Sequence, residues 1–230
     1  MSDLLDTIEI ETEPNPMASI IWLHGLGADG NDFVPIVREL DLAGARAIRF
    51  VFPHAPMRAV TINNGYVMRA WYDVSYGDLE RKSRQADEAG VRASEAAIGK
   101  LIGRETGRGI ASENIVLAGF SQGGAIALQT GLRYPQRLAG VMALSTYLPL
   151  ASTLAQEAAQ CNARTPIFMA HGTHDPVVPY TMGSDSRELL ANLDYDVEWH
   201  DYPMQHSVCL EELQDIGAWL TRVLHSTQSE

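Results

Sequence analysis

The chain has 230 residues, of which 46% are hydrophobic and 20% are charged, and its formal net charge is −12. This length and composition favour a single α/β domain that spans residues 1–230 around a well-buried core. A chain this acidic is poorly suited to bind nucleic acid or an anionic membrane through its overall charge, so we expect neither as a partner.

The two cysteines, Cys161 and Cys209, form no metal-binding or redox motif. Isolated thiols are typical of a reducing compartment. The acidic N-terminus lacks the basic segment and apolar stretch of a signal peptide, and no apolar run reaches membrane-spanning length. We therefore expect a cytoplasmic protein without stable membrane insertion.

Short apolar runs alternate with longer amphipathic stretches along the chain. The runs predict strands at Leu5–Glu11, Ser19–Leu23, Ala47–Phe52, Ile115–Gly119, Val141–Leu144, Ile167–His171 and Val197–Tyr202. The amphipathic stretches predict helices at Phe33–Leu40, Ala86–Glu105, Gln122–Tyr134, Leu154–Gln160, Tyr180–Asn192 and Cys209–Arg222. This alternation predicts a mostly parallel, twisted sheet with helices on both faces.

The longest predicted irregular stretch is Pro53–Asp78, and a loop of this length in a compact domain usually has a function. Ligands of a parallel sheet bind at the carboxyl ends of its strands. Four predicted strands end in polar or glycine-rich turns, namely His24–Gly27, Gly119–Gly123, His171–Asp175 and Met204–Ser207. We expect these turns to converge at one edge of the sheet.

The turn Gly119-Phe-Ser-Gln-Gly123 lies between a predicted strand and a predicted helix, with Ser121 at its apex. A tight turn exposes the hydroxyl of such a serine, and glycines two residues before and after it relieve crowding. The alternative is a helix N-terminus that a serine merely caps. The strand before and the helix after favour a nucleophile.

A serine nucleophile needs an imidazole to accept its proton and a carboxylate to fix the imidazole tautomer. His206 follows the last predicted strand, where its ring can reach back to Ser121; a solvated loop histidine is the alternative. His24 and His171 each precede a glycine at a strand end, so we expect them to brace turns. Asp175 is the expected carboxylate, with a plain Asp-Pro turn as its alternative.

The oxyanion of a tetrahedral intermediate needs N–H donors. The N–H of Gln122 lies at the N-terminus of the helix after the serine, where the helix dipole favours negative charge. The N–H of Leu26, in the first glycine-rich turn, is the second candidate. A plain glycine turn is the alternative for that segment.

Five stretches together resemble the acyl-protein thioesterase and lysophospholipase family of carboxylesterases. They are Trp22–Asp29, Trp71–Asp73, Gly119–Gly124, His171–Pro179 and Tyr202–Val208. The resemblance implies the α/β-hydrolase fold, with Ser121, Asp175 and His206 as a catalytic triad and Leu26 and Gln122 as oxyanion donors. It also implies that the loop around Trp71 lies beside an acyl pocket.

These features predict a serine carboxylesterase that hydrolyses small to medium acyl esters through an acyl-enzyme, without a metal or an organic cofactor. Acyl-protein thioesters and lysophospholipids are alternative substrates of the same site. An amidase, an acyltransferase and a non-catalytic binding protein are the alternative classes.

The expected substrate-binding residues are Trp71, Met68 and Leu148, with Leu150 as a further candidate for the acyl groove. Ordinary loop packing is the alternative for these side chains. The chain has no insertion large enough for a separate lid domain, so we expect an open site. Exposed apolar surface near such a site is also compatible with a homodimer.

Overall fold

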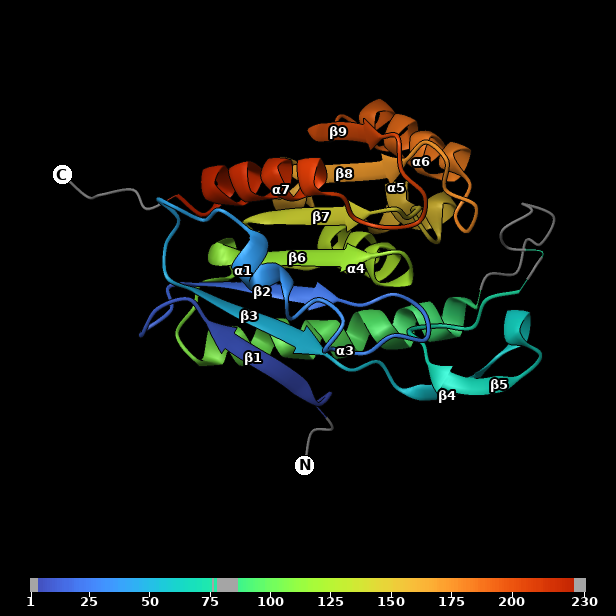
Figure 1. Cartoon of the computed structure of the whole chain (residues 1–230), viewed down its shortest axis with the longest axis horizontal. Helices are drawn as coiled ribbons and strands as arrows, with labels where there is room; N and C mark the ends of the chain where they lie inside the picture. The colour runs from blue at the N-terminus through green and yellow to red at the C-terminus, as the bar shows by residue number, and fades with distance from the viewer. Residues whose placement is uncertain (1–3, 76, 78–86, 226–230) are drawn as a thin grey trace.

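The computed structural model describes residues 4–75, 77 and 87–225 (Figure 1). Seven strands form one sheet in the order β1-β3-β2-β6-β7-β8-β9, and all neighbours are parallel except β1 and β3. The strands are β1 Thr7–Glu11, β2 Ala18–Leu23, β3 Ile48–Pro53, β6 Ile115–Phe120, β7 Gly140–Leu144, β8 Ile167–Gly172 and β9 Val197–Tyr202. The central strands β2, β6 and β7 are almost entirely buried and, apart from Ser19, carry no polar side chain, because the sheet is covered on both sides.

Helices lie on both faces of this sheet, as the sequence predicts (Figure 1). One face carries α3 (Glu88–Gly107), α4 (Gln122–Arg133), α5 (Leu154–Glu157) and α6 (Tyr180–Asn192). The other face carries α1 (Ile36–Glu39) and α7 (Leu210–Val223). Each layer of helices buries its own apolar cluster against the sheet. Within the described parts of the chain, no helix is long and apolar enough to cross a membrane.

The predicted elements agree with the observed ones to within two residues at each end, apart from two helices. The stretch Phe33–Leu40 forms only the short helix α1. The stretch Leu154–Gln160 is divided into α5 and a 3₁₀ turn at Gln160–Asn162. The predicted start of the long helix at Ala86 lies outside the described residues.

The prediction that Pro53–Asp78 is irregular is wrong for its first part. A hairpin of β4 (Met57–Val60) and β5 (Tyr66–Arg69) forms a separate two-stranded sheet. The sequence pattern does not predict this hairpin because each strand has only four residues, of which half are exposed, and neither strand shows a regular apolar alternation. The predicted end of the stretch, Asp78, is outside the described residues.

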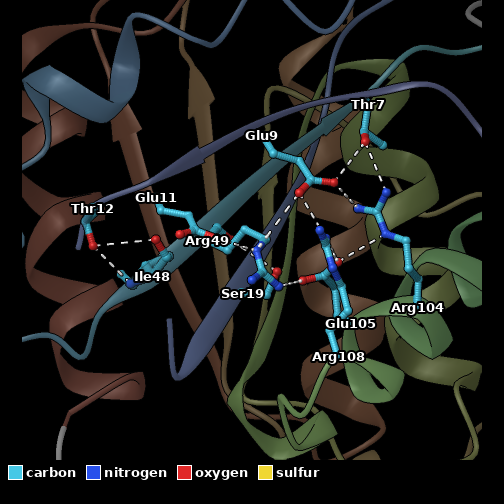
Figure 2. Close-up of polar contacts among 10 residues, drawn as sticks. All are labelled: Thr7, Glu9, Glu11, Thr12, Ser19, Ile48, Arg49, Arg104, Glu105 and Arg108. Carbon is cyan, nitrogen blue, oxygen red and sulfur yellow. Dashed lines mark hydrogen bonds and ion pairs between the residues drawn. The ribbon is translucent and has the colours of Figure 1, made fainter. Parts of the chain in front are cut away.

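A cluster of charged side chains fixes the edge strand β1 to β3 and α3 (Figure 2). The carboxylate of Glu105 is fully buried and contacts three guanidinium groups, those of Arg49, Arg104 and Arg108, at 2.9, 3.1 and 3.0 Å. Glu9 on β1 pairs with Arg104 and Arg108, both at 2.9 Å. The antiparallel edge strand is thus held by ion pairs as well as by its backbone ladder.

Candidate active site

Ser121 lies in the turn between β6 and α4, at the carboxyl edge of the sheet. Its backbone has φ 55° and ψ −122°, a conformation that residues with a side chain rarely adopt. The N–H of Ser121 donates to the carbonyl of Leu144 at 2.8 Å, and the hydroxyl of Thr146 donates to the carbonyl of Ser121 at 2.6 Å. These bonds hold Ser121 in the strained turn, with its side chain in the wall of a cavity.

The glycines on either side of Ser121 allow backbone segments to approach closely. A Cβ atom at Gly119 would collide with the backbone of Gly123. A Cβ atom at Gly123 would collide with the carbonyl groups of Leu23 and His24, at the end of β2. The predicted reason for glycine at these two positions is therefore confirmed.

His206 connects Ser121 to Asp175, although the three residues follow different strands. The Nε2 atom of His206 lies 2.9 Å from the Oγ of Ser121, and its Nδ1 lies 2.6 Å from the Oδ2 of Asp175. The imidazole packs on the ring of Phe120, with 4.7 Å between ring centroids. The structure thus brings together the serine, histidine and aspartate singled out from the sequence, in the geometry of a nucleophile, a base and an orienting acid.

The environment of Asp175 favours its ionised form. Burial opposes ionisation, but hydrogen bonds from His206 and from the N–H groups of Val177 and Val178 outweigh it, so the pKa of the Asp175 carboxyl lies below its ordinary value. The two N–H groups donate to Oδ1 at 2.8 and 2.9 Å, which leaves Oδ2 for the imidazole. An ionised Asp175 fixes the proton of His206 on Nδ1, and Nε2 is then free to accept the proton of Ser121.

His24 and His171 brace turns, as expected. The N–H of Ala55 donates to Nε2 of His24 at 3.0 Å, so the proton of this ring is on Nδ1, which donates to the carbonyl of Gly25 at 2.7 Å. Nε2 of His171 lies 3.0 Å from the carbonyl of Val178. Burial lowers the pKa of both imidazoles, which favours neutral, structural rings.

The side chain of Gln122 clamps the segment that follows β5. Its Oε1 accepts the N–H of Trp71, and its Nε2 donates to the carbonyl of Tyr72, both at 2.7 Å. The indole N–H of Trp71 donates to the carbonyl of His24 at 2.9 Å. This network, which the sequence did not reveal, joins the first residue of α4 to the turn that contains Leu26.

The two predicted oxyanion donors lie beside the serine. Leu26 and Gln122 both line the cavity that contains Ser121. Gln122 is the first residue of α4, so its N–H has no partner within the helix. Gly27, with φ 79°, donates its N–H to the carbonyl of Arg69 at 2.9 Å and thereby fixes the turn after Leu26.

The cavity at Ser121 has a volume of about 190 Å³ and mostly apolar walls. Besides Leu26, Ser121 and Gln122, it is lined by Ile62, Asn63, Tyr72, Val74, Tyr147, Val177 and Val178. None of these further wall residues was predicted from the sequence, although Tyr72, Val177 and Val178 lie within the stretches that carry the resemblance. A cavity of this size and character suits a short apolar chain.

The three residues expected to bind substrate lie outside this wall. Trp71 is fully buried beneath the turn at His24. The sulfur of Met68 accepts an N–H of Asn63 at 3.3 Å, one layer away from the cavity. Leu148 is 6% exposed and lines a neighbouring cavity instead.

A larger depression of about 540 Å³ lies at the opposite ends of the strands, around Arg46, Arg137 and Arg222. Its walls carry both charges but no serine, cysteine or histidine that could act as a nucleophile or base. In the described part of the chain, no group of three or more His, Cys, Asp or Glu side chains is arranged to hold a metal ion. The chemistry of the Ser121 site therefore makes it the better candidate.

Comparison with known proteins places this geometry in context. The model of the phospholipase/carboxylesterase family matches residues 6–224. An acyl-protein thioesterase 1 of Neurospora crassa is 42% identical over 218 residues, which cover 90% of this chain and 87% of that protein. One of Mycosarcoma maydis is 41% identical over 223 residues, which cover 91% and 92% of the two chains.

A solved structure shows the same architecture. The crystal structure of Zea mays acyl-protein thioesterase 2 superimposes with a TM-score of 0.81 at 30% identity. The match covers 95% of this chain and 99% of the maize chain. The fold is therefore shared over almost the whole of both molecules.

Proposed function

Because the chain belongs to the phospholipase/carboxylesterase family of α/β-hydrolases, which act on ester bonds, we propose that it hydrolyses acyl esters with Ser121 as nucleophile. His206 is the general base, and Asp175 orients it. The continuous chain of contacts from Asp175 through His206 to Ser121, at 2.6 and 2.9 Å, carries this proposal.

In the first step, the hydroxyl of Ser121 attacks the substrate carbonyl while Nε2 of His206 takes its proton. The N–H groups of Leu26 and Gln122 bind the resulting oxyanion. One such donor is worth roughly 3–4 kcal/mol of transition-state stabilisation in a comparable hydrolase. The turn at Ser121 keeps the nucleophile in the same cavity as Leu26 and Gln122.

In the second step, His206 returns the proton to the departing alcohol, and the acyl group remains on Ser121. Water, activated by His206, then attacks the acyl-enzyme and releases the acid. Asp175 stays ionised throughout, in agreement with its lowered pKa. A protein that only binds esters would have no need for this aligned base and acid.

Small to medium acyl esters are the proposed substrates because the cavity at Ser121 is apolar and holds only about 190 Å³. Acyl-protein thioesters are the second candidate, since relatives that are 34–42% identical are named acyl-protein thioesterase 1. The attack on a thioester carbonyl uses the same residues. Peptides acylated on a cysteine or on a serine distinguish these candidates through their relative kcat/KM values.

The experiment that tests the proposal compares wild type with Ser121→Ala on p-nitrophenyl acetate through decanoate. We expect kcat to fall by several orders of magnitude, since triad deletions in a serine protease cost about 10⁶. Similar rates for the two proteins would rule out Ser121 as nucleophile. Phosphonate labelling of Ser121 gives an independent measurement, and matched amides or added alcohols reveal amidase or transferase activity.

We place the protein in the cytoplasm. The support for this compartment is that Cys161 and Cys209 are both free thiols in the structure. Fractionation of the native host with a compartment marker tests this assignment.

A further inference from the structure

Two tyrosine hydroxyls meet at the wall of the Ser121 cavity. Tyr72 follows β5, Tyr147 follows β7, and their phenol oxygens share a hydrogen bond at 2.9 Å. Both side chains line the cavity of about 190 Å³. Segments that are far apart in the sequence are therefore joined at the place where an acyl chain would lie.

A second cavity also has Tyr147 in its wall. It has a volume of about 280 Å³, and its other wall residues are the apolar Leu148, Ala151, Met182 and Leu189 and the polar Asp185 and Ser186. Tyr147 lines this cavity as well as the first, so the two cavities meet at this residue. We expect removal of its side chain to join the two spaces.

The backbone of the Tyr147 loop is also fixed. The N–H of Leu148 donates to the hydroxyl of Ser186 on α6 at 2.9 Å, and that hydroxyl donates to the carbonyl of Met182 at 2.6 Å. Tyr147 is therefore held at its ring by Tyr72 and next to its backbone by α6. A side chain held at both ends makes a rigid partition.

We propose that the hydrogen-bonded pair Tyr72–Tyr147 sets the length of the acyl chain that the enzyme accepts. This inference rests on the proposed function of Ser121. If a chain carbon needs about the volume of one liquid water, ~30 Å³, the first cavity accepts about six carbons beyond the carbonyl. The second cavity would accept roughly nine more, so the partition separates medium-chain from long-chain substrates.

The polar contact of the two hydroxyls adds to this selection. A longer chain can pass only if the ring of Tyr147 turns away, which breaks the hydrogen bond to Tyr72. A methylene that becomes buried favours binding by about fourfold. When the partition is closed, methylenes beyond the length that fits the first cavity are not buried, so they add nothing to binding.

The test measures kcat/KM for p-nitrophenyl esters of 2, 4, 8, 12 and 16 carbons. The variants are Tyr147→Ala, Tyr147→Phe, Tyr72→Phe and the double Phe variant. We expect wild type to prefer the 8-carbon over the 12-carbon ester, and Tyr147→Ala to raise the 12-to-8 ratio at least tenfold. Wild type that prefers 12 or 16 carbons, or a folded Tyr147→Ala with an unchanged ratio, overturns the inference.

The Phe variants test the hydrogen bond itself while they keep the rings. Each should raise the 12-to-8 ratio severalfold, and the double variant should raise it by less than the product of the two single effects because all three variants lose the bond between Tyr72 and Tyr147. If Tyr147→Ala does not fold, the Phe variants alone test the inference. An unchanged 12-to-8 ratio in both single Phe variants then overturns it. Tyr202→Phe is the control, since it also removes a tyrosine hydroxyl bound at 2.7 Å, here to Asp215.

Two failures are distinguishable. If wild type hydrolyses no ester faster than Ser121→Ala, the proposed function is wrong. If wild type requires Ser121 for turnover but the tyrosine variants keep its chain-length profile, only the inference about Tyr72 and Tyr147 is wrong.

Discussion

The indole Nε1 of Trp71 donates a hydrogen bond to the carbonyl oxygen of His24 at 2.9 Å. This bond links the loop after β5 to the turn that presents Leu26, the proposed oxyanion donor. Trp71 is fully buried, and its backbone N–H donates a hydrogen bond to the side-chain Oε1 of Gln122 at 2.7 Å. We therefore expect Trp71 to position the turn that contains Leu26.

Trp71→Phe keeps an aromatic ring but removes the N–H. We expect kcat to fall about fivefold with little change in KM, since one net hydrogen bond is worth about 1 kcal/mol and its effect is on transition-state geometry. Steady-state kinetics on a p-nitrophenyl ester measure this. Trp219→Phe, a buried tryptophan on the opposite face of the sheet, is the control. Equal losses of kcat in both variants would contradict the role of Trp71.

Asp175→Asn tests the tautomer of His206. The amide can no longer hold the imidazole proton on Nδ1, so we expect kcat to fall by roughly 10³–10⁴ while the fold is retained. Circular dichroism and single-turnover kinetics measure the two properties. Asp201→Asn, which affects a hydrogen bond from Tyr180, serves as control and should keep kcat. A loss of less than tenfold in Asp175→Asn would show that another group orients His206.

Glu212 makes the stability of the protein depend on pH. Its side chain is fully buried in α7, and burial, with the charge of Asp215 acting in the same direction, raises the pKa of the carboxyl to about 8. The folded state therefore holds a proton that the unfolded chain releases near pH 4.5. The contribution of this proton to the free energy of unfolding is complete below pH 4.5 and is lost as the pH rises toward 8.

Glu212→Gln stays neutral at every pH, so it should not show this loss. Between pH 5 and 8, we expect the free energy of unfolding of the variant to gain on the order of 4 kcal/mol relative to wild type. Urea unfolding at several pH values measures the difference. A difference that does not change with pH would mean that Glu212 is ionised in the folded protein.

Glu105→Gln tests the charged cluster beneath β1. The substitution leaves Arg49, Arg104 and Arg108 without the buried carboxylate, so we expect a loss of about 3 kcal/mol in the free energy of unfolding. Glu88→Gln, which removes an exposed pair with Arg92, should cost less than about 0.5 kcal/mol. Equal costs in the two variants would show that burial of Glu105 has no energetic consequence.

The sequence predicts the main sheet and its helices well because their apolar periodicities are strong. It also predicts Ser121, Asp175 and His206, since each follows a strand and belongs to a recognisable turn. The structure brings these three residues into contact, and their catalytic roles remain the proposal that Ser121→Ala and Asp175→Asn test. The β4–β5 hairpin was not predictable from periodicity because its strands have only four residues each and are partly exposed.

The residues that line the cavity were harder to predict from the sequence than Ser121, Asp175 and His206. Trp71 and Met68 lie in the right loop, but a motif does not say which side of a loop each side chain faces. Tyr147 and Val177 approach the cavity from the loops after two different strands, β7 and β8, so only the folded backbone brings them together. Contacts of this kind depend on the crossover geometry, which one sequence does not reveal.

The order of the strands also determines when the site comes into existence. Ser121 follows β6, in the middle of the sheet, whereas His206 follows β9, which is hydrogen-bonded on one side only, to β8. During synthesis the chain emerges N-terminus first. The turn at Ser121 can therefore form long before His206 is available, and on the proposed mechanism we expect the newly made protein to stay inert toward esters until nearly the whole chain has left the ribosome.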